Sequence, residues 1–191
     1  MRKNQFNVII SGVGGQGIIS LLQILAEAAF LEGNEVKSSE LHGLSQRGGS
    51  VAAHLRWGKE VCSPLILPAR ADLILALEIS EALRVGFYTH SKTIFLVNKK
   101  LNPFLNCWPE KKILENLNKL GNLFLIEASK ICQEKLKSEV ISGVYLLGVG
   151  VNKKLLPLKK FSLLKAIKKI IPEKYQSLNF EAFKLGFNNS D

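Results

Sequence analysis

A glycine-rich turn, placed between an apolar run and an amphipathic pattern, is the feature that most restricts how this chain folds. Gly12, Gly14 and Gly17 have the G-x-G-x-x-G spacing, after the apolar residues 8–10 and before a helical pattern. This order is typical of a strand–turn–helix unit in a parallel α/β sheet. The N–H groups and positive dipole end of such a helix favour anions such as pyrophosphate. The same glycines equally suit close packing of the three elements, so both interpretations stay open.

The composition is that of one ordinary globular domain. The chain has 191 residues, of which 47% are hydrophobic and 22% charged, and no segment resembles a membrane span or a cleaved leader. No Gly-Lys-Ser/Thr follows the glycine turn, so nucleotide hydrolysis is not expected. The three cysteines, Cys62, Cys107 and Cys132, form no C-x-x-C pair, so we expect no metal or iron–sulfur site on this chain. We expect a cytoplasmic protein with no membrane partner.

The formal net charge of +10 gathers near the C-terminus, where lysines dominate from residue 153 onward. A basic stretch of this kind can attract nucleic acid, an anionic ligand or an acidic protein. The lysines, however, alternate with leucine and isoleucine at helical spacing, which favours a solvated helix face above a buried face. Arg47-Gly48-Gly49 occurs once and no basic–aromatic platform accompanies it, so nucleic-acid binding is not expected.

Periodicity predicts a Rossmann-like α/β fold: a doubly wound, mostly parallel sheet with a β-hairpin insertion and a helical C-terminal tail. We expect a single domain over residues 1–191, with a core over about 1–150 and the tail over about 151–191. The predicted hairpin joins 51–57 to 60–62 around Gly58-Lys59, and the run 71–77 is expected to be buried on both faces. The other expected strands are 6–11, 35–41, 93–98 and 122–126; the expected helices are 18–32, 78–88, 109–120, 128–136, 140–151, 161–171 and 175–185.

The segment from His42 to Val51 crowds polar donors and glycines into one loop after the second expected strand. A loop at that position can lie at the carboxyl edge of the sheet, beside the glycine turn, where such folds bind ligands. Arg47 is suited to a bidentate contact with a phosphate or a carboxylate. Glu40 has two open roles, as an acid–base partner of His42 or as the ribose-binding acid of a dinucleotide site.

Two motifs together resemble the gamma-type subunit or domain of 2-oxoacid:ferredoxin oxidoreductases, and among these most resemble the beta subunit of the indolepyruvate branch. They are the glycine turn 12–17 and the loop His42-Gly43…Gln46-Arg47-Gly48-Gly49, and further similarity extends through 63–83 to 179–186. The resemblance implies a cytoplasmic complex that converts a 2-oxoacid and coenzyme A to an acyl-CoA and reduces ferredoxin. An arylpyruvate is the leading substrate class in this branch.

The resemblance also implies a division of labour between chains. Thiamine diphosphate and the iron–sulfur clusters are expected on a large alpha subunit, while coenzyme A is a possible co-substrate at the interface; this chain alone is expected to be inactive. No catalytic or metal-binding residue is assigned to it. The cofactor-binding candidates are Gly12, Gly14, Gly15, Gln16, Gly17 and Arg47, and the interface-loop candidates are His42, Gly43, Gln46, Gly48 and Gly49.

Two other classes of protein share the first glycine motif. A free-standing NAD(P)-binding protein or dehydrogenase would use the glycines together with Glu40, although 191 residues leave little room for a second catalytic domain. A tubulin-like assembly protein would need a second, glycine- and threonine-rich phosphate loop, which does not occur downstream. The dinucleotide-binding protein is therefore the stronger alternative.

Overall fold

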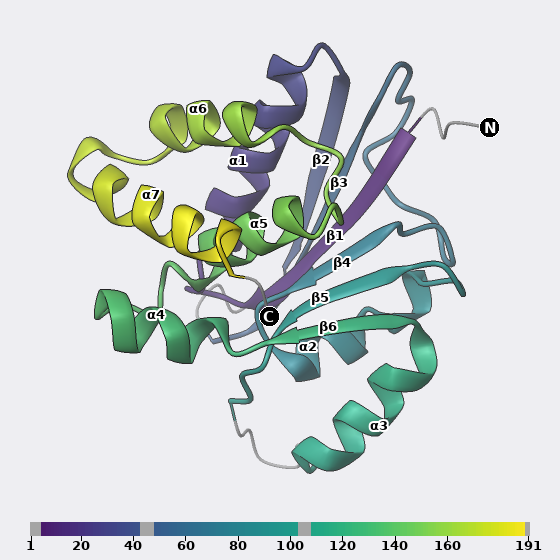
Figure 1. Ribbon diagram of the computed structural model, residues 1–191. Helices are drawn as coiled ribbons and strands as arrows, with labels where there is room; N and C mark the ends of the chain where they lie inside the picture. Colours follow the sequence, from purple (N-terminus) through teal and green to yellow (C-terminus); the bar gives the residue numbers. More distant parts are fainter. Residues whose placement is uncertain (1–4, 43–47, 103–107, 190–191) are drawn as a thin grey trace.

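The computed structural model describes residues 5–42, 48–102 and 108–189, which form one α/β unit around a single sheet (Figure 1). The sheet has six strands in the order β2-β3-β1-β4-β5-β6. Their bounds are β1 Gln5–Val13, β2 Glu35–His42, β3 Ser50–Gly58, β4 Leu73–Ala76, β5 Ile94–Asn98 and β6 Asn122–Ile126. The predicted class, a Rossmann-like, doubly wound, mostly parallel sheet with a β-hairpin insertion and a helical C-terminal tail, is confirmed, and the antiparallel hairpin is formed by β2 and β3.

Helices cover both faces of the sheet (Figure 1). One face carries α1, α5, α6 and α7, with α4 beside them, and the other carries α2 and α3. The bounds are α1 Ile18–Leu31, α2 Ile79–Arg84, α3 Glu110–Leu120, α4 Ala128–Leu136, α5 Ser142–Asn152, α6 Lys160–Ile170 and α7 Glu173–Phe187, with a 3-10 turn, η1, at Gly86–Tyr88. The face under α1 and α5 is apolar because alternate residues of the central strands, such as Val8 and Ile10, point into it.

The strand directions bring the ends of β1 and β2 to the same edge. β1, β4, β5 and β6 are parallel, whereas β3 pairs antiparallel with both β1 and β2. The register places Gly12 opposite Val51 and His42 opposite the same Val51. The last residues of β1 and β2 and the first residues of β3 therefore meet at the carboxyl edge of the parallel strands, which is where folds of this class hold ligands.

The predicted hairpin over residues 51–62 is wrong. β3 forms as expected, but residues 59–72 form no strand, and the antiparallel partners of β3 are β1 and β2. The side chain of Arg56 explains the difference, because its guanidinium donates to the carbonyls of Ser63 and Leu65 and draws the chain away from a strand register. The carboxylate of Glu35 in addition accepts the N–H of Val61 at 2.9 Å.

The predicted helix over 78–88 is also shorter than expected. α2 ends at Arg84, and the chain continues as the 3-10 turn η1, in which the N–H of Tyr88 donates to the carbonyl of Val85. Gly86 lies at this break, and a Cβ there would stand 2.8 Å from Leu120 of α3. The close approach of α3 thus coincides with the change from α to 3-10 geometry.

Candidate functional site

The glycine turn occupies residues 12–17 between β1 and α1. Gly15 and Gly17 have φ of 101° and 83°, in the left-handed region that side chains with a Cβ rarely adopt. Gly17 is the residue at which α1 begins, and no side chain caps the helix. Neither glycine has an atom within 4 Å of the place where a Cβ would stand. These two glycines are therefore set by backbone conformation, and the space beside them is open.

The second predicted segment is hydrogen-bonded to this turn. The N–H of Gly14 donates to the carbonyl of Gly49 at 2.9 Å, and the N–H of Gly48 donates to the carbonyl of Gly14 at 3.3 Å. The structure thus brings Gly48 and Gly49 to the glycine turn, as the loop position predicted. His42 belongs to β2 by its backbone. Gly43, Gln46 and Arg47 lie outside the described residues, so their predicted roles stay predictions.

Gln16 has a structural role that the sequence did not reveal. Its Oε1 accepts the N–H of Val13 at 2.8 Å, and its Nε2 donates to Oε1 of Glu78 at 2.8 Å. A Cβ on Gly12 would stand 2.6 Å from the same Gln16 Oε1. Gly12 is therefore required so that the Gln16 side chain can fold across the turn. The interpretation that a glycine is needed for close packing therefore applies to Gly12. At Gly15 and Gly17 no neighbouring atom lies within 4 Å of the place of a Cβ, so close packing does not explain those two glycines.

Two buried carboxylates stand behind the turn. Glu78 lies two residues after the end of β4, directly before α2, and is completely buried; Glu81, in the first turn of α2, is 3% exposed. Glu78 accepts hydrogen bonds from Gln16, Ser80 and Asn102. Glu81 accepts the hydroxyl of Ser50 and, at 3.2 Å, the Nε of Arg84. The pair links β3, β4 and α2 to the glycine turn at the carboxyl edge.

Burial raises the pKa of the Glu78 carboxyl, and the nearby charge of Glu81 adds to the effect, while the bonds from Gln16, Asn102 and Ser80 oppose it. Sequence reasoning did not assign Glu78 or Glu81 to the site. The signal was present, because an acidic residue that directly follows a strand buried on both faces is expected at the carboxyl edge. Buried carboxyl groups with a raised pKa are also common at ligand-binding sites.

Three cavities border the turn. The first, about 520 Å³, is lined by Gly14, Gly15, Gly17, Glu40 and residues of α1 and β3, so Glu40 does lie beside the glycines as predicted. The second, about 490 Å³, is a mostly apolar groove between α1, α5 and α7 that shares Gly17 and Ser20 with the first. The third, about 70 Å³, holds Lys100 near Gly15 and Gln16.

This arrangement offers a place for an elongated ligand, with an anionic part at the start of α1 and an apolar part in the groove. Lys100, which lines the third cavity with Gly15 and Gln16, pairs with Glu139 at 2.6 Å.

The described residues can be searched for a metal site, and their cysteines for reactivity. No group of three histidine, cysteine or acidic side chains in that part of the chain is placed to hold a metal ion. Cys62 is exposed and Cys132 is buried, and burial raises the pKa of the Cys132 thiol to about 11, which keeps it protonated and unreactive.

The fold and the site together define a Rossmann-like domain. At the carboxyl edge of its sheet it has a glycine turn, the residues Gly48 and Gly49 hydrogen-bonded to that turn, and neighbouring cavities. The chain belongs to the pyruvate ferredoxin/flavodoxin oxidoreductase family, whose model matches residues 7–189. It is 34% identical to indolepyruvate oxidoreductase subunit IorB of Archaeoglobus fulgidus, over 97% of this chain and 96% of that one. The IorB subunit of Thermococcus kodakarensis is 32% identical, over 95% and 94% of the two chains.

Solved structures share the fold. The gamma subunit of a keto/oxoacid ferredoxin oxidoreductase from Geobacter sulfurreducens superposes with a TM-score of 0.71 at 23% identity, over 95% of this chain and 96% of that one. A 2-oxoglutarate:ferredoxin oxidoreductase from Magnetococcus marinus gives a TM-score of 0.75 at 21% identity. Here 97% of this chain matches only 31% of the other, so the fold occurs both as a separate subunit and as one part of a longer chain.

The sequence predicts no membrane-spanning segment, and the helices of the structure can be compared with that prediction. Across residues 5–42, 48–102 and 108–189, no helix combines the length and the apolar character that crossing a bilayer requires.

Proposed function

We propose that this chain is the subunit without iron–sulfur clusters of a complex that oxidatively decarboxylates a 2-oxoacid, in the presence of coenzyme A, to an acyl-CoA and reduces ferredoxin. The observation that carries the proposal is the match of almost the whole chain, at 31% identity or more, to four subunits named for indolepyruvate oxidoreductase. Those names favour indolepyruvate or another arylpyruvate as the substrate. Relatives named for pyruvate and ketoisovalerate are more distant, at 29% identity or less.

In this proposal the chain binds and positions, and the chemistry occurs on its partner. Thiamine diphosphate and the iron–sulfur clusters belong to a large alpha subunit, and ferredoxin interacts with the assembled complex. The proposed site of action is the cytoplasm.

The glycine turn is proposed to receive the phosphate end of coenzyme A. Gly15 and Gly17 leave open space at the start of α1, where backbone N–H groups and the helix dipole favour an anion. The neighbouring apolar groove is suited to the less polar arm of the same molecule. Arg47, adjacent in sequence to Gly48, would supply a charge-assisted contact, and His42, Gly43 and Gln46 would shape the subunit interface or the acyl-acceptor channel.

Reconstitution tests the proposed role. The chain is expressed alone and together with its large partner, and 2-oxoacid-dependent reduction of a ferredoxin or a viologen dye is measured with coenzyme A present. The expected result is activity only in the complex, because the nucleophilic and redox groups are on the other chain. Turnover by the pure chain alone, or a complex whose activity is unchanged when this chain is omitted, would contradict the proposal.

A free-standing NAD(P)-binding protein is the second candidate, because Glu40 and the glycines line one cavity. The sheet argues against it: β3 stands between β1 and β2, so the strand that carries Glu40 is not the direct neighbour of the glycine strand. Titration of the isolated chain with NAD and NADP by calorimetry separates the two. Tight binding of either nucleotide would favour the dehydrogenase interpretation.

A further inference from the structure

A second cavity region lies at the opposite edge of the sheet from the glycine turn and has a volume of about 1050 Å³. Gln5 and Asn7 come from the start of β1, Asp72 immediately precedes β4, and Lys92 precedes β5. The amino ends of three parallel strands therefore form its floor. A concave space of this size is at the upper end of the range usual for small-molecule sites.

The cavity is held open by a rigid polar frame on one side. The Arg56 guanidinium donates from Nε to Asn7 Oδ1 at 3.0 Å and from a terminal nitrogen to Gln5 Oε1 at 2.7 Å. Its other terminal nitrogen donates to the carbonyls of Ser63 and Leu65. Arg56 is thus fully used in fixing the wall and is not a ligand group.

The loop that closes the cavity is also anchored. The N–H of Asp72 donates to the carbonyl of Asn7, and the Asn7 N–H donates to Asp72 Oδ2, at 2.8 and 2.9 Å. The Asn7 side-chain amide donates to the carbonyl of Arg70, and the N–H of Ala69 donates to the carbonyl of Phe87. Because both walls are tied by backbone contacts, the cavity is preorganised and a ligand need not order it.

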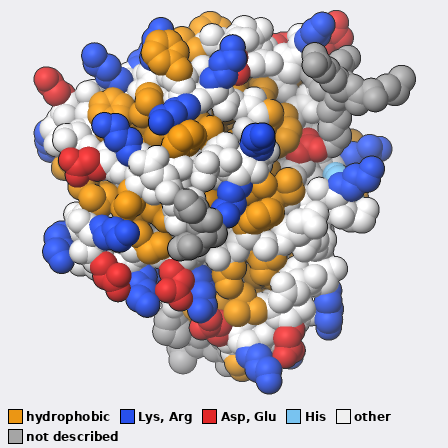
Figure 2. Space-filling model, in the orientation of Figure 1, with side chains coloured by type: hydrophobic (Ala, Val, Ile, Leu, Met, Phe, Trp, Pro, Cys, Tyr) orange, Lys and Arg blue, Asp and Glu red, His pale blue; other side chains and the backbone are white. Residues whose placement is uncertain are grey.

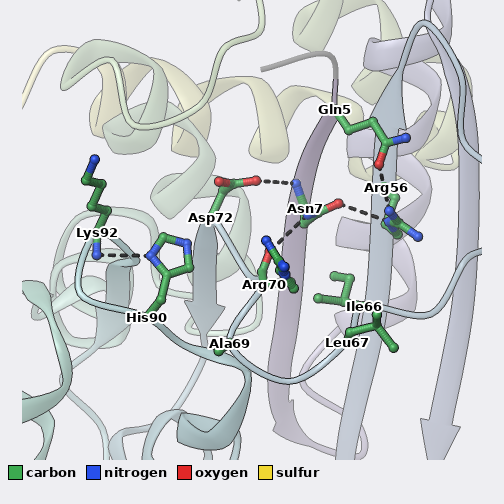
Figure 3. A pocket seen from close by; sticks show the side chains of 10 residues that line it. All are labelled: Gln5, Asn7, Arg56, Ile66, Leu67, Ala69, Arg70, Asp72, His90 and Lys92. Carbon is green, nitrogen blue, oxygen red and sulfur yellow. Dashed lines mark hydrogen bonds between the residues drawn. The ribbon is translucent and has the colours of Figure 1, made fainter. Parts of the chain in front are cut away.

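Two cationic side chains that line the cavity take no part in this hydrogen-bonded frame. Within the described part of the chain, the Arg70 guanidinium and the Lys92 ammonium make no hydrogen bond or ion pair, and both residues are exposed. His90 accepts the N–H of Lys92 at its Nδ1, which leaves Nε2 as the ring nitrogen that carries hydrogen and can donate. Figure 3 shows Arg70 near the middle of the cavity, with His90 and Lys92 together on one side.

The charges on the described part of the lining favour an anion. Arg56 is held by the frame, so Arg70 and Lys92 are the cations left for a ligand, and Asp72 is the acidic side chain among the described lining residues. The remaining wall is apolar: Ile66 and Ala69 line it beside Leu67, whose side chain is 68% exposed. An exposed leucine on a concave wall gives a flat apolar group a surface on which to pack.

We propose that this cavity binds a small phosphate ester, with the phosphate at Arg70 on the side of the cavity where His90 and Lys92 lie and the body of the molecule against Ile66 and Leu67. Phosphate oxygens match the guanidinium fork and the lysine point charge, and the Nε2–H of His90 is a further donor in the cavity. The site shares no residue with the glycine turn, so it does not depend on the proposed binding of coenzyme A.

The test uses the full chain labelled with ¹⁵N and follows the amide signals of residues 7, 70, 72, 90 and 92. The probes are ADP, inorganic phosphate and adenosine. The double variant Arg70→Gln/Lys92→Gln removes the two cations, and Lys111→Gln/Lys119→Gln, on the exposed side of α3, removes the same charge elsewhere. ADP is expected to shift the five signals saturably, and the first double variant to raise the dissociation constant about tenfold or more.

Lys111→Gln/Lys119→Gln is expected to change the affinity for ADP only slightly. Added salt is expected to weaken the binding of ADP to the unaltered chain. ADP is expected to bind more tightly than inorganic phosphate because of the apolar wall, and adenosine more weakly than ADP because it lacks the phosphate. Equal affinity for ADP and inorganic phosphate would overturn the assignment to a phosphate ester. Absence of saturable shifts, or shifts that persist in Arg70→Gln/Lys92→Gln, would overturn the site itself.

Discussion

The side chain of Gln16 connects an apparently simple glycine motif to a buried carboxylate. From the sequence, Gln16 is one of two non-glycine residues in the turn 12–17, and it was predicted to accept an anion together with the glycines. In the structure both ends of its amide are used, by Val13 and by Glu78. A pattern of glycines predicts the turn, because it reports backbone conformation. It does not predict which side chain folds across the turn, because that depends on Glu78, 62 residues away.

The pH dependence of unfolding tests the burial of Glu78. Burial raises the pKa of this carboxyl from 4.5, so the folded chain keeps the proton in a pH range where the unfolded chain has lost it. The stability contribution is therefore complete below about pH 4.5 and is lost as the pH rises through the raised pKa, by about 1.4 kcal/mol for each unit between the two pKa values.

Urea titrations of the unaltered chain and of Glu78→Gln, which cannot ionise at this position, provide the measurement. The difference in free energy of unfolding, unaltered minus variant, is expected to decrease as the pH rises. Other groups titrate in both proteins and cancel to first order. A difference that stays constant from about pH 4 to about pH 8 would contradict the burial argument.

At the scale of elements, periodicity located the helices and strands but not the strand partners. The predicted ranges 35–41, 122–126 and 128–136 differ from β2, β6 and α4 by one residue at most. The predicted position of the hairpin was wrong because strand pairing is a non-local choice. Residues 60–62 are suited to a strand locally, but Glu35 bonds Val61, and Arg56 bonds the chain just after it at Ser63 and Leu65. The division into a core and a C-terminal tail stays a prediction, although Phe183 and Leu163 share a hydrophobic cluster with Ile10.

The crossing of α5 and α7 gives an element-scale prediction. Gly148 of α5 faces the backbone at Phe183, and Gly186 of α7 faces the carbonyl of Tyr145; a Cβ at either glycine would collide with main-chain atoms. Gly186→Ala is expected to destabilise the chain by about 1–3 kcal/mol through overpacking, offset in part by about 1 kcal/mol of helix propensity. A main-chain obstacle cannot rotate away, so the collision is expected to dominate.

The measurement is the midpoint of denaturant unfolding, with Lys184→Ala as the control. Lys184 is exposed on the same helix and two residues away, so its replacement is expected to change stability by less than about 0.5 kcal/mol. A Gly186→Ala chain as stable as the control would show that α5 and α7 do not approach as closely as described.

At the scale of the whole molecule, the basic C-terminal region has the form that its periodicity predicted. α6 buries Leu163, Ala166 and Ile167 and exposes lysines on its other side, one of which pairs with Glu27 of α1 at 2.8 Å. Figure 2 shows these cations scattered among apolar side chains and acids on this face. Sequence reasoning could predict a solvated helix face, because that depends on spacing alone. It could not predict a partner, because complementarity of charge and shape depends on the surfaces of both molecules.

The assembled complex tests the central claim, which is that this chain supplies an anion-binding turn to a partner that carries out the chemistry. Initial rates of 2-oxoacid-dependent ferredoxin reduction are measured at varied coenzyme A and varied 2-oxoacid, with Arg47→Ala and, as a control, Lys59→Ala at the opposite edge of the sheet. Loss of one charge-assisted contact of about 1.5–3 kcal/mol is expected to raise the KM for coenzyme A roughly 10-fold or more, with little change in the KM for the 2-oxoacid. An unchanged dependence on coenzyme A in Arg47→Ala would contradict it.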